Sequence, residues 1–171
     1  MGWSSEVTVP KFDKYIICLA PHTSNWDFVI GQLYAVGNGQ RCQFLMKKEW
    51  FVGPLGTIFR KMGGIPVNRS KKTHLTDQLA EIATKSDRFE LCITPEGTRS
   101  LNPDWKLGFY YIALKANLPI LLYAADYSQK KVYATKYIIP SGDVESDLRE
   151  IKLYFKDFKG KHPEKFTIGE V

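Results

Sequence analysis

A histidine and an aspartate five positions apart are the pair of side chains best suited to catalysis in this sequence. His22 and Asp27 lie in segment 21–27, PHTSNWD, which follows an apolar run of strand length and precedes a run with helical spacing. If His22 lies in the loop and Asp27 in the first helical turn, the carboxylate can accept a hydrogen bond from one imidazole nitrogen. The other nitrogen can then remove a proton, so the spacing predicts a general base that a carboxylate orients.

The same segment also fits a purely structural role. Ser24 and Asp27 have the spacing of a capping box, in which Asp27 bonds back to the first turn of a helix and favours its dipole. A single histidine is more often a hydrogen-bonded structural residue than a catalyst. The residues of this segment alone leave both interpretations open.

A second polar segment, 94–100 with the sequence TPEGTRS, also follows a predicted strand. Gly97 allows a positive φ or a close backbone approach. The guanidinium of Arg99 is a planar fork suited to phosphate or carboxylate, and Thr98 and Ser100 add hydroxyl groups. Taken alone, the segment is equally typical of a turn with a surface arginine.

A third segment, 63–69 with the sequence GGIPVNR, is glycine-rich but lacks the lysine and the following Ser or Thr of a phosphate loop. Arg69 follows a short predicted strand, where a solvated arginine is the alternative. All three segments place a polar or charged group at the carboxyl end of a strand. In one sheet these ends converge on a single cleft.

The elements that must position these groups alternate between strand-length apolar runs and amphipathic runs, which predicts an α/β fold. We expect a single domain over residues 1–171, with a mixed, mainly parallel sheet flanked by helices. Segment 48–62 is mixed in pattern and is interrupted at Gly53-Pro54. The tail beyond Gly160 is polar and is expected to be loose. The predicted strands are 15–20, 43–46, 65–67, 89–94, 119–124 and, at a sheet edge, 131–139; the predicted helices are 25–36, 74–85, 107–116 and 143–158.

Composition narrows the classes of function. With 24 Lys and Arg against 18 Asp and Glu, the net charge is +6, which makes anionic partners plausible. The basic residues are spread along the chain with no basic tail, so we expect no nucleic-acid partner. No metal site is expected, because the Cys and His residues are not clustered in the way that a zinc site needs, and Cys18, Cys42 and Cys92 are interpreted as free thiols.

These motifs together resemble the glycerolipid and lysophospholipid acyltransferases. The shared features are the order His-x-x-x-x-Asp, Gly-x-Ile-Pro-x-x-Arg, Pro-Glu-Gly-Thr-Arg-Ser and a Leu-Pro-Ile strand, which span about residues 15–127. A strand and helix over 131–158 follow the motif-bearing part. The resemblance implies a fold like that of glycerol-3-phosphate acyltransferase. Two positions depart from the family pattern: Thr94 replaces its usual phenylalanine, and Asn68 stands where many members carry aspartate.

The resemblance also implies roles for individual residues. His22 would deprotonate the acceptor hydroxyl and Asp27 would orient it. The acceptor and its phosphate would be bound by a set comprising Arg69, Glu96, Gly97, Thr98 and Arg99. The acyl donor would be acyl-CoA or acyl carrier protein, with no bound cofactor. The acceptor would be a lysophospholipid such as 1-acylglycerol-3-phosphate.

A lipid acceptor implies a peripheral protein on the inner, cytoplasmic face of the cell membrane. The sequence shows no signal peptide, no myristoylation signal and no run long enough to span a bilayer. Segment 47–61 combines Trp50, Phe51, Leu55 and Phe59 with flanking lysines and arginines, which is typical of an interfacial patch. Packing of these aromatic side chains inside the domain is the alternative.

Three other functions remain open at this stage. A thioesterase or esterase would use water in place of the acceptor alcohol. A basic phosphate- or nucleic-acid-binding module would show salt-sensitive binding that survives His22→Ala. A lipid-binding protein would keep the fold without turnover.

Overall fold

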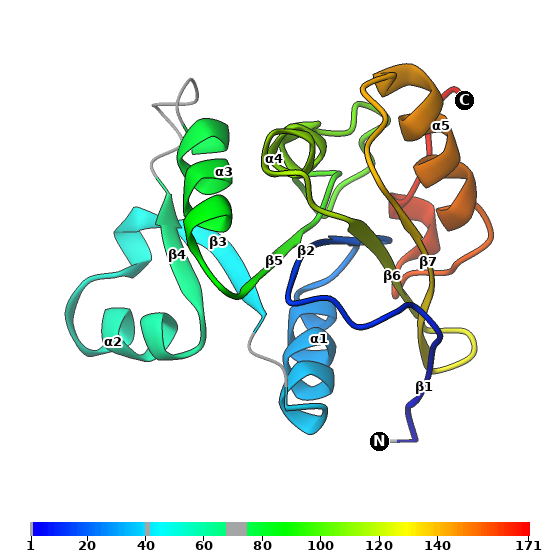
Figure 1. Cartoon of the computed structure of the whole chain (residues 1–171). Helices are drawn as coiled ribbons and strands as arrows, with labels where there is room; N and C mark the ends of the chain where they lie inside the picture. Colours follow the sequence, from blue (N-terminus) through cyan, green and yellow to red (C-terminus); the bar gives the residue numbers. More distant parts are fainter. Residues whose placement is uncertain (1, 40–41, 68–74) are drawn as a thin grey trace.

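The computed structural model describes residues 2–39, 42–67 and 75–171, and its centre is a seven-stranded sheet (Figure 1). The strand order is β1-β7-β6-β2-β5-β3-β4. All neighbouring strands are parallel except β6 and β7, which confirms the predicted mixed, mainly parallel α/β fold. The strands are β1 (Ser4–Val7), β2 (Lys14–Leu19), β3 (Gln43–Lys47), β4 (Gly64–Val67), β5 (Phe89–Ile93), β6 (Ile120–Asp126) and β7 (Lys131–Ile138).

Helices cover both faces of this sheet, because side chains alternate between the faces along each strand. In β2, Ile16 and Cys18 pack in the larger core with α3, α4 and α5, whereas Tyr15 and Ile17 pack on the other face with α1. Every residue of β6 is buried, as expected for a central strand covered on both sides. The helices are α1 (Asn25–Gly37), η1 (Lys48–Trp50), α2 (Gly53–Lys61), α3 (Leu75–Lys85), α4 (Gly108–Ala116), α5 (Val144–Phe155) and η2 (Pro163–Lys165).

The structure corrects one expectation, adds one strand and defines the mixed segment. β7 is not an edge strand, because β1 pairs with it from Ser4↔Lys131 to Val7↔Ala134. The sequence did not predict β1, whose four residues are all exposed and show no alternation of burial. The mixed segment 48–62 is resolved into η1 and α2.

The tail beyond Gly160 is docked on the domain rather than loose. Phe166 and Ile168 pack against the larger core, and the indole N–H of Trp105 donates to the carbonyl oxygen of Thr167 at 3.2 Å. The Lys152 ammonium group donates to the carbonyl oxygen of Glu170 at 3.3 Å. The polar composition of the tail concealed these apolar and backbone contacts.

Candidate active site

The His22 segment lies at the centre of the sheet edge formed by the strand carboxyl ends. β2 has β5 on one side and β6 on the other, and all three strands are parallel. The chain leaving β2 is therefore flanked by the chain leaving β5, which carries Glu96, and the chain leaving β6, which carries Tyr127. This adjacency brings together groups that are distant in sequence.

Asp27 is the most heavily bonded side chain of the site. It is 1% exposed, and its Oδ2 accepts hydrogen bonds from the backbone N–H groups of Thr23 (2.8 Å) and Ser24 (2.9 Å). The Ser24 hydroxyl accepts in return from Trp26 N at 3.2 Å, and the pair forms a complete capping box at the start of α1. The structural interpretation of the segment is therefore correct, and the cap itself fixes the carboxylate.

The same carboxylate faces the imidazole. His22 Nδ1 lies 3.2 Å from Asp27 Oδ2, at ion-pair distance but outside hydrogen-bond geometry. Such contacts often tighten only when substrate binds. Nδ1 is buried with no other partner within the described residues. Nε2 is thus the ring nitrogen available to a substrate.

Tyr127 is a third member of this group that the sequence reasoning missed. Its hydroxyl donates to Asp27 Oδ1 at 2.6 Å. Burial alone would raise the pKa of Asp27, but the close contact with His22 and the hydrogen bonds from Tyr127 and the backbone of Ser24 and Thr23 outweigh it and lower the pKa. Asp27 is therefore held as an anion beside the imidazole. The signal for Tyr127 is its position directly after β6, which corresponds to the positions of His22 and Glu96 beyond the ends of β2 and β5.

Glu96 holds the backbone of the histidine rather than its ring. The side chain is 4% exposed, and its Oε1 accepts from His22 N at 2.7 Å, whereas Oε2 is buried without a partner in the described part of the chain. Burial raises the pKa of Glu96 from 4.5 to about 7, against the opposing effect of backbone hydrogen bonds. Its carboxyl group does not line the cleft described next.

A cleft of about 740 Å³ opens beside His22. Gly97, Thr98 and Arg99 line it, so the structure brings these predicted residues to the histidine. Gly97 has a φ of +66°, a conformation that favours glycine. Two further cations, Lys47 and Lys106, also line the cleft. The rest of the wall is largely apolar and includes Leu19, Phe28, Phe44, Leu79, Ile93, Phe109 and Ile112.

Arg69, the remaining predicted phosphate-binding residue, lies outside the described residues. Lys106 was not predicted as a site residue, because it lies beyond the TPEGTRS segment in the sequence. Its backbone N–H donates to the carbonyl oxygen of Pro95 at 2.7 Å, and this bond ties Lys106 to that segment.

The C-terminal segment 159–162 packs against the loop that carries His22. The backbone N–H of His162 donates to the Thr23 hydroxyl at 3.1 Å, and Thr23 is 2% exposed. A Cβ added at Gly160 would lie 2.7 Å from the Thr23 hydroxyl oxygen, so only glycine allows this approach. Tyr127 N donates to the carbonyl oxygen of Lys159 at 2.9 Å, so the tail also fixes the residue bonded to Asp27.

Across residues 2–39, 42–67 and 75–171, no group of three or more His, Cys, Asp and Glu side chains could hold a metal ion. No helix within these described ranges has the length and apolar character needed to cross a bilayer.

Comparison with known proteins identifies a family and a related solved structure. The family model described as Acyltransferase matches residues 5–124. A crystal structure of the 1-acyl-sn-glycerophosphate acyltransferase PlsC from Thermotoga maritima matches with a TM-score of 0.61 and 21% sequence identity. That match covers 86% of this chain and 67% of that chain. No curated protein matches.

Proposed function

We propose that this chain, which belongs to the Acyltransferase family, moves a fatty acyl group from a thioester to the free hydroxyl of a lysophospholipid. The donor is acyl-CoA or acyl carrier protein, and lysophosphatidic acid is the first acceptor to test. One observation carries this proposal: a single cleft combines His22, three cations and an apolar wall. An anionic headgroup and a fatty acyl chain match these two kinds of wall.

His22 acts as general base in the proposed reaction. Nε2 removes the proton of the acceptor hydroxyl, and the oxygen attacks the thioester carbonyl carbon. The C–S bond of the tetrahedral intermediate then breaks, and the thiolate takes the proton from the imidazolium. The anionic Asp27, 3.2 Å from Nδ1, stabilises the imidazolium between these two steps. No enzyme nucleophile is required, because the acceptor oxygen takes that place.

The acceptor phosphate is proposed to bind at the cationic part of the cleft. Arg99 offers a planar fork of donors, and Lys47 and Lys106 add point charges. We propose that Arg69 also binds the acceptor phosphate. A thioesterase needs no such anchor, so these cations favour an acceptor alcohol over water. Because the proposed acceptor is a lipid, we also propose that the reaction takes place at a membrane surface.

The test uses purified protein with labelled long-chain acyl-CoA and, separately, the acyl carrier protein thioester. Each donor is incubated with and without lysophosphatidic acid. We expect acylated lipid that requires the acceptor and is abolished in His22→Ala. Release of fatty acid without any acceptor would identify a thioesterase instead. Absence of product from folded protein with both donors would contradict the proposal for this acceptor.

A further inference from the structure

The outward side of α1 carries an apolar stripe where a surface helix normally carries charge. Trp26, Val29, Leu33 and Val36 follow one another at intervals of three and four residues, so they share one face of the helix. Their exposed fractions are 51%, 38%, 54% and 73%. The one charged residue of α1, Asp27, is buried. A helix that is apolar on both faces is ordinarily covered on both faces.

A second stripe lies on η1 and α2. Trp50, Val52, Leu55, Ile58 and Met62 are exposed by 38% to 74%. The two expected aromatic residues between them, Phe51 and Phe59, instead pack ring to ring at 6.2 Å and are only partly exposed. Of the apolar residues that the sequence suggested for an interfacial patch here, Trp50 and Leu55 are exposed, whereas the two phenylalanines are only partly exposed.

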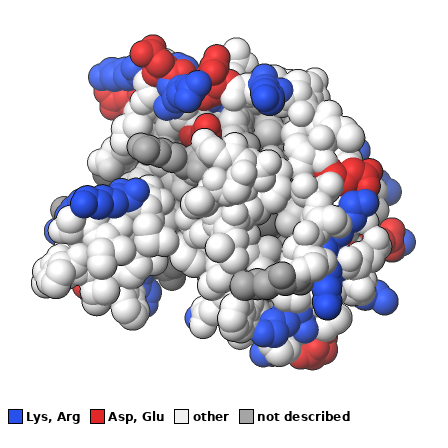
Figure 2. Space-filling view, turned by 90° about the horizontal axis from the view of Figure 1, so that it is seen from below, with Lys and Arg blue, Asp and Glu red and all other residues white. Residues whose placement is uncertain are grey.

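The two stripes form one surface. A groove is lined from α1 by Leu33 and Val36 and from α2 by Arg60, Lys61 and Met62. Seen from below, the side toward which α1 and α2 lie in Figure 1, the molecule shows a broad area without charged residues (Figure 2). Monomeric proteins rarely expose contiguous apolar areas of this kind unless something binds there.

The charges around this surface are mostly positive. Lys47 and Lys48 precede Trp50, Arg60 and Lys61 border the groove, and the Lys161 ammonium lies 5.1 Å from the centre of the Trp26 ring. Within α1, η1 and α2, which are described throughout, Glu49 is the one exposed acid. Apolar side chains bordered by Lys and Arg are the pattern by which helices bind anionic lipid surfaces.

The surface also reaches the proposed active site. Asn25 and Phe28, on either side of Trp26, line the cleft, and so does Lys47 at the entrance to η1. A bilayer against α1 and α2 would thus lie next to the opening that holds His22. A lipid acceptor could then reach the base without leaving the interface.

We propose that the apolar faces of α1 and α2, with their basic border, form a docking surface for an anionic lipid bilayer. This inference rests on the proposed lipid acceptor for its purpose, but the contact itself does not require catalysis. It differs from the patch expected in segment 47–61 because half of it belongs to α1.

Vesicle flotation tests the surface. Wild type is mixed with vesicles of phosphatidylcholine alone, or of phosphatidylcholine and phosphatidylglycerol in equal parts. We expect wild type to float mainly with the anionic vesicles. The double variants Leu33→Ser/Val36→Ser and Leu55→Ser/Ile58→Ser should each lose at least about tenfold in partitioning. Arg60→Gln/Lys61→Gln should lose about fivefold per charge, on anionic vesicles only.

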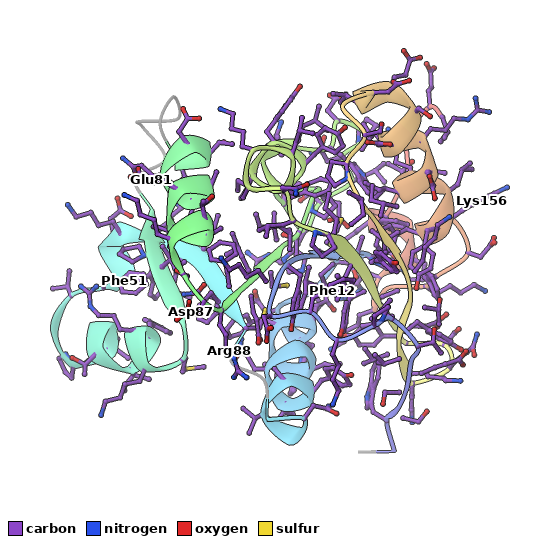
Figure 3. All side chains as sticks on the ribbon, viewed as in Figure 1. Phe12, Phe51, Glu81, Asp87, Arg88 and Lys156 are labelled. Atoms are coloured by element: carbon purple, nitrogen blue, oxygen red, sulfur yellow. The ribbon has the colours of Figure 1, made fainter. Side chains whose placement is uncertain are left out.

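Matched controls come from the far side of the molecule. Leu153 is 47% exposed on α5, and Arg149 and Lys156 are exposed cations there. Figure 3 shows Lys156 on the opposite side from Phe51, which marks the α2 side. Leu153→Ser and Arg149→Gln/Lys156→Gln should float like wild type. Equal losses in these controls would overturn the assignment of the surface.

The remaining outcomes separate other occupants and the proposed function. No flotation of wild type, or flotation of the stripe variants at the wild-type level, overturns the proposal. A dimer that the α1 variants convert to monomer, seen by sedimentation velocity, would identify a second copy as the occupant and also overturn it. Acyl transfer to dispersed lysophosphatidic acid is measured in parallel. Flotation without transfer rejects the proposed acceptor and supports the lipid-docking surface. Transfer without flotation supports the proposed acceptor and rejects the docking surface.

Discussion

Two buried aspartates, at opposite ends of the chain, are built into the fold in nearly the same way. Asp27 lies in the first turn of α1 and Asp147 in the first turn of α5. Each accepts a hydrogen bond from a tyrosine hydroxyl, Tyr127 at 2.6 Å and Tyr110 at 2.7 Å. Each also accepts from backbone N–H groups of the preceding loop. A buried, tyrosine-bonded carboxylate is thus a means of fixing a loop to a helix.

The two sites differ in the loop that is fixed. Asp147 binds the backbone N–H and the hydroxyl of Ser141, at 2.7 and 3.0 Å, and so closes a surface turn. Asp27 holds a loop whose imidazole, His22, lines a cleft of about 740 Å³. The carboxylate alone does not identify a catalytic site. At Asp27, the titratable ring next to the carboxylate and the cleft in front of that ring support the proposal of such a site.

His22→Ala should have the largest effect, because it removes the proposed base and leaves the hydrogen bonds to Asp27 intact. We expect kcat for acyl transfer to fall by about 10²- to 10⁴-fold. Thermal unfolding should change little. His162→Ala is the matched control: its imidazole lies 3.7 Å from Glu164, and only its backbone contacts Thr23. Comparable losses in both variants would argue against a specific role for His22.

Asp27→Asn and Asp147→Asn test the comparison directly. Asp27→Asn should reduce kcat by roughly 10²- to 10³-fold, because an amide cannot stabilise the imidazolium. Asp147→Asn should keep wild-type kcat but lower the free energy of unfolding by about 1–3 kcal/mol. Urea unfolding and initial rates at a temperature where both variants are folded measure the difference. A loss of activity in folded Asp147→Asn would break the comparison.

Tyr127→Phe should have a smaller effect than either change at Asp27. One hydrogen bond that lowers the pKa of Asp27 is lost, so this pKa should rise. A lowered carboxyl pKa stabilises the fold above the unfolded-state value, and this stabilisation is lost as the pH falls through the folded-state value. The variant should therefore lose stability at a higher pH than wild type, and kcat should fall by about three- to tenfold.

Tyr110→Phe is the counterpart of this variant at Asp147. We expect a similar loss of hydrogen-bond stabilisation and unchanged kcat. Unfolding followed from neutral to acid pH, with kcat at neutral pH, compares the two variants. Identical kcat values for both variants would show that Tyr127 does not help to position the proposed catalytic pair.

Among the variants around His22, Glu96→Gln should have the smallest effect on kcat, and it should have a distinct effect on stability. Wild-type Glu96 has a pKa raised to about 7, so the folded state keeps a proton that the unfolded state releases above its value of 4.5. Stability therefore falls as the pH rises between these two values. Gln keeps an oxygen for the N–H of His22 and does not ionise. The variant should gain stability relative to wild type from pH 5 to pH 8 in urea unfolding, and a pH-independent difference would contradict this.

The sequence was sufficient where chemistry and local structure coincide. The spacing of Ser24 and Asp27 encodes both the helix cap and the partner of His22, because a capping box turns its acidic side chain back toward the preceding loop. Strands with alternating or continuous burial, such as β2 and β6, were also predicted to within a few residues. β1 was missed because it has no buried face and exists through its pairing with β7.

Only the tertiary structure decided which distant groups surround the proposed catalytic pair. Tyr127 reaches Asp27 across 100 positions, Glu96 holds the backbone of His22 across 74, and Gly160 closes on Thr23. Residue periodicity records which face of an element is buried but not which strands are neighbours. The order β6-β2-β5 sets these contacts, and it results from packing between segments far apart in the chain.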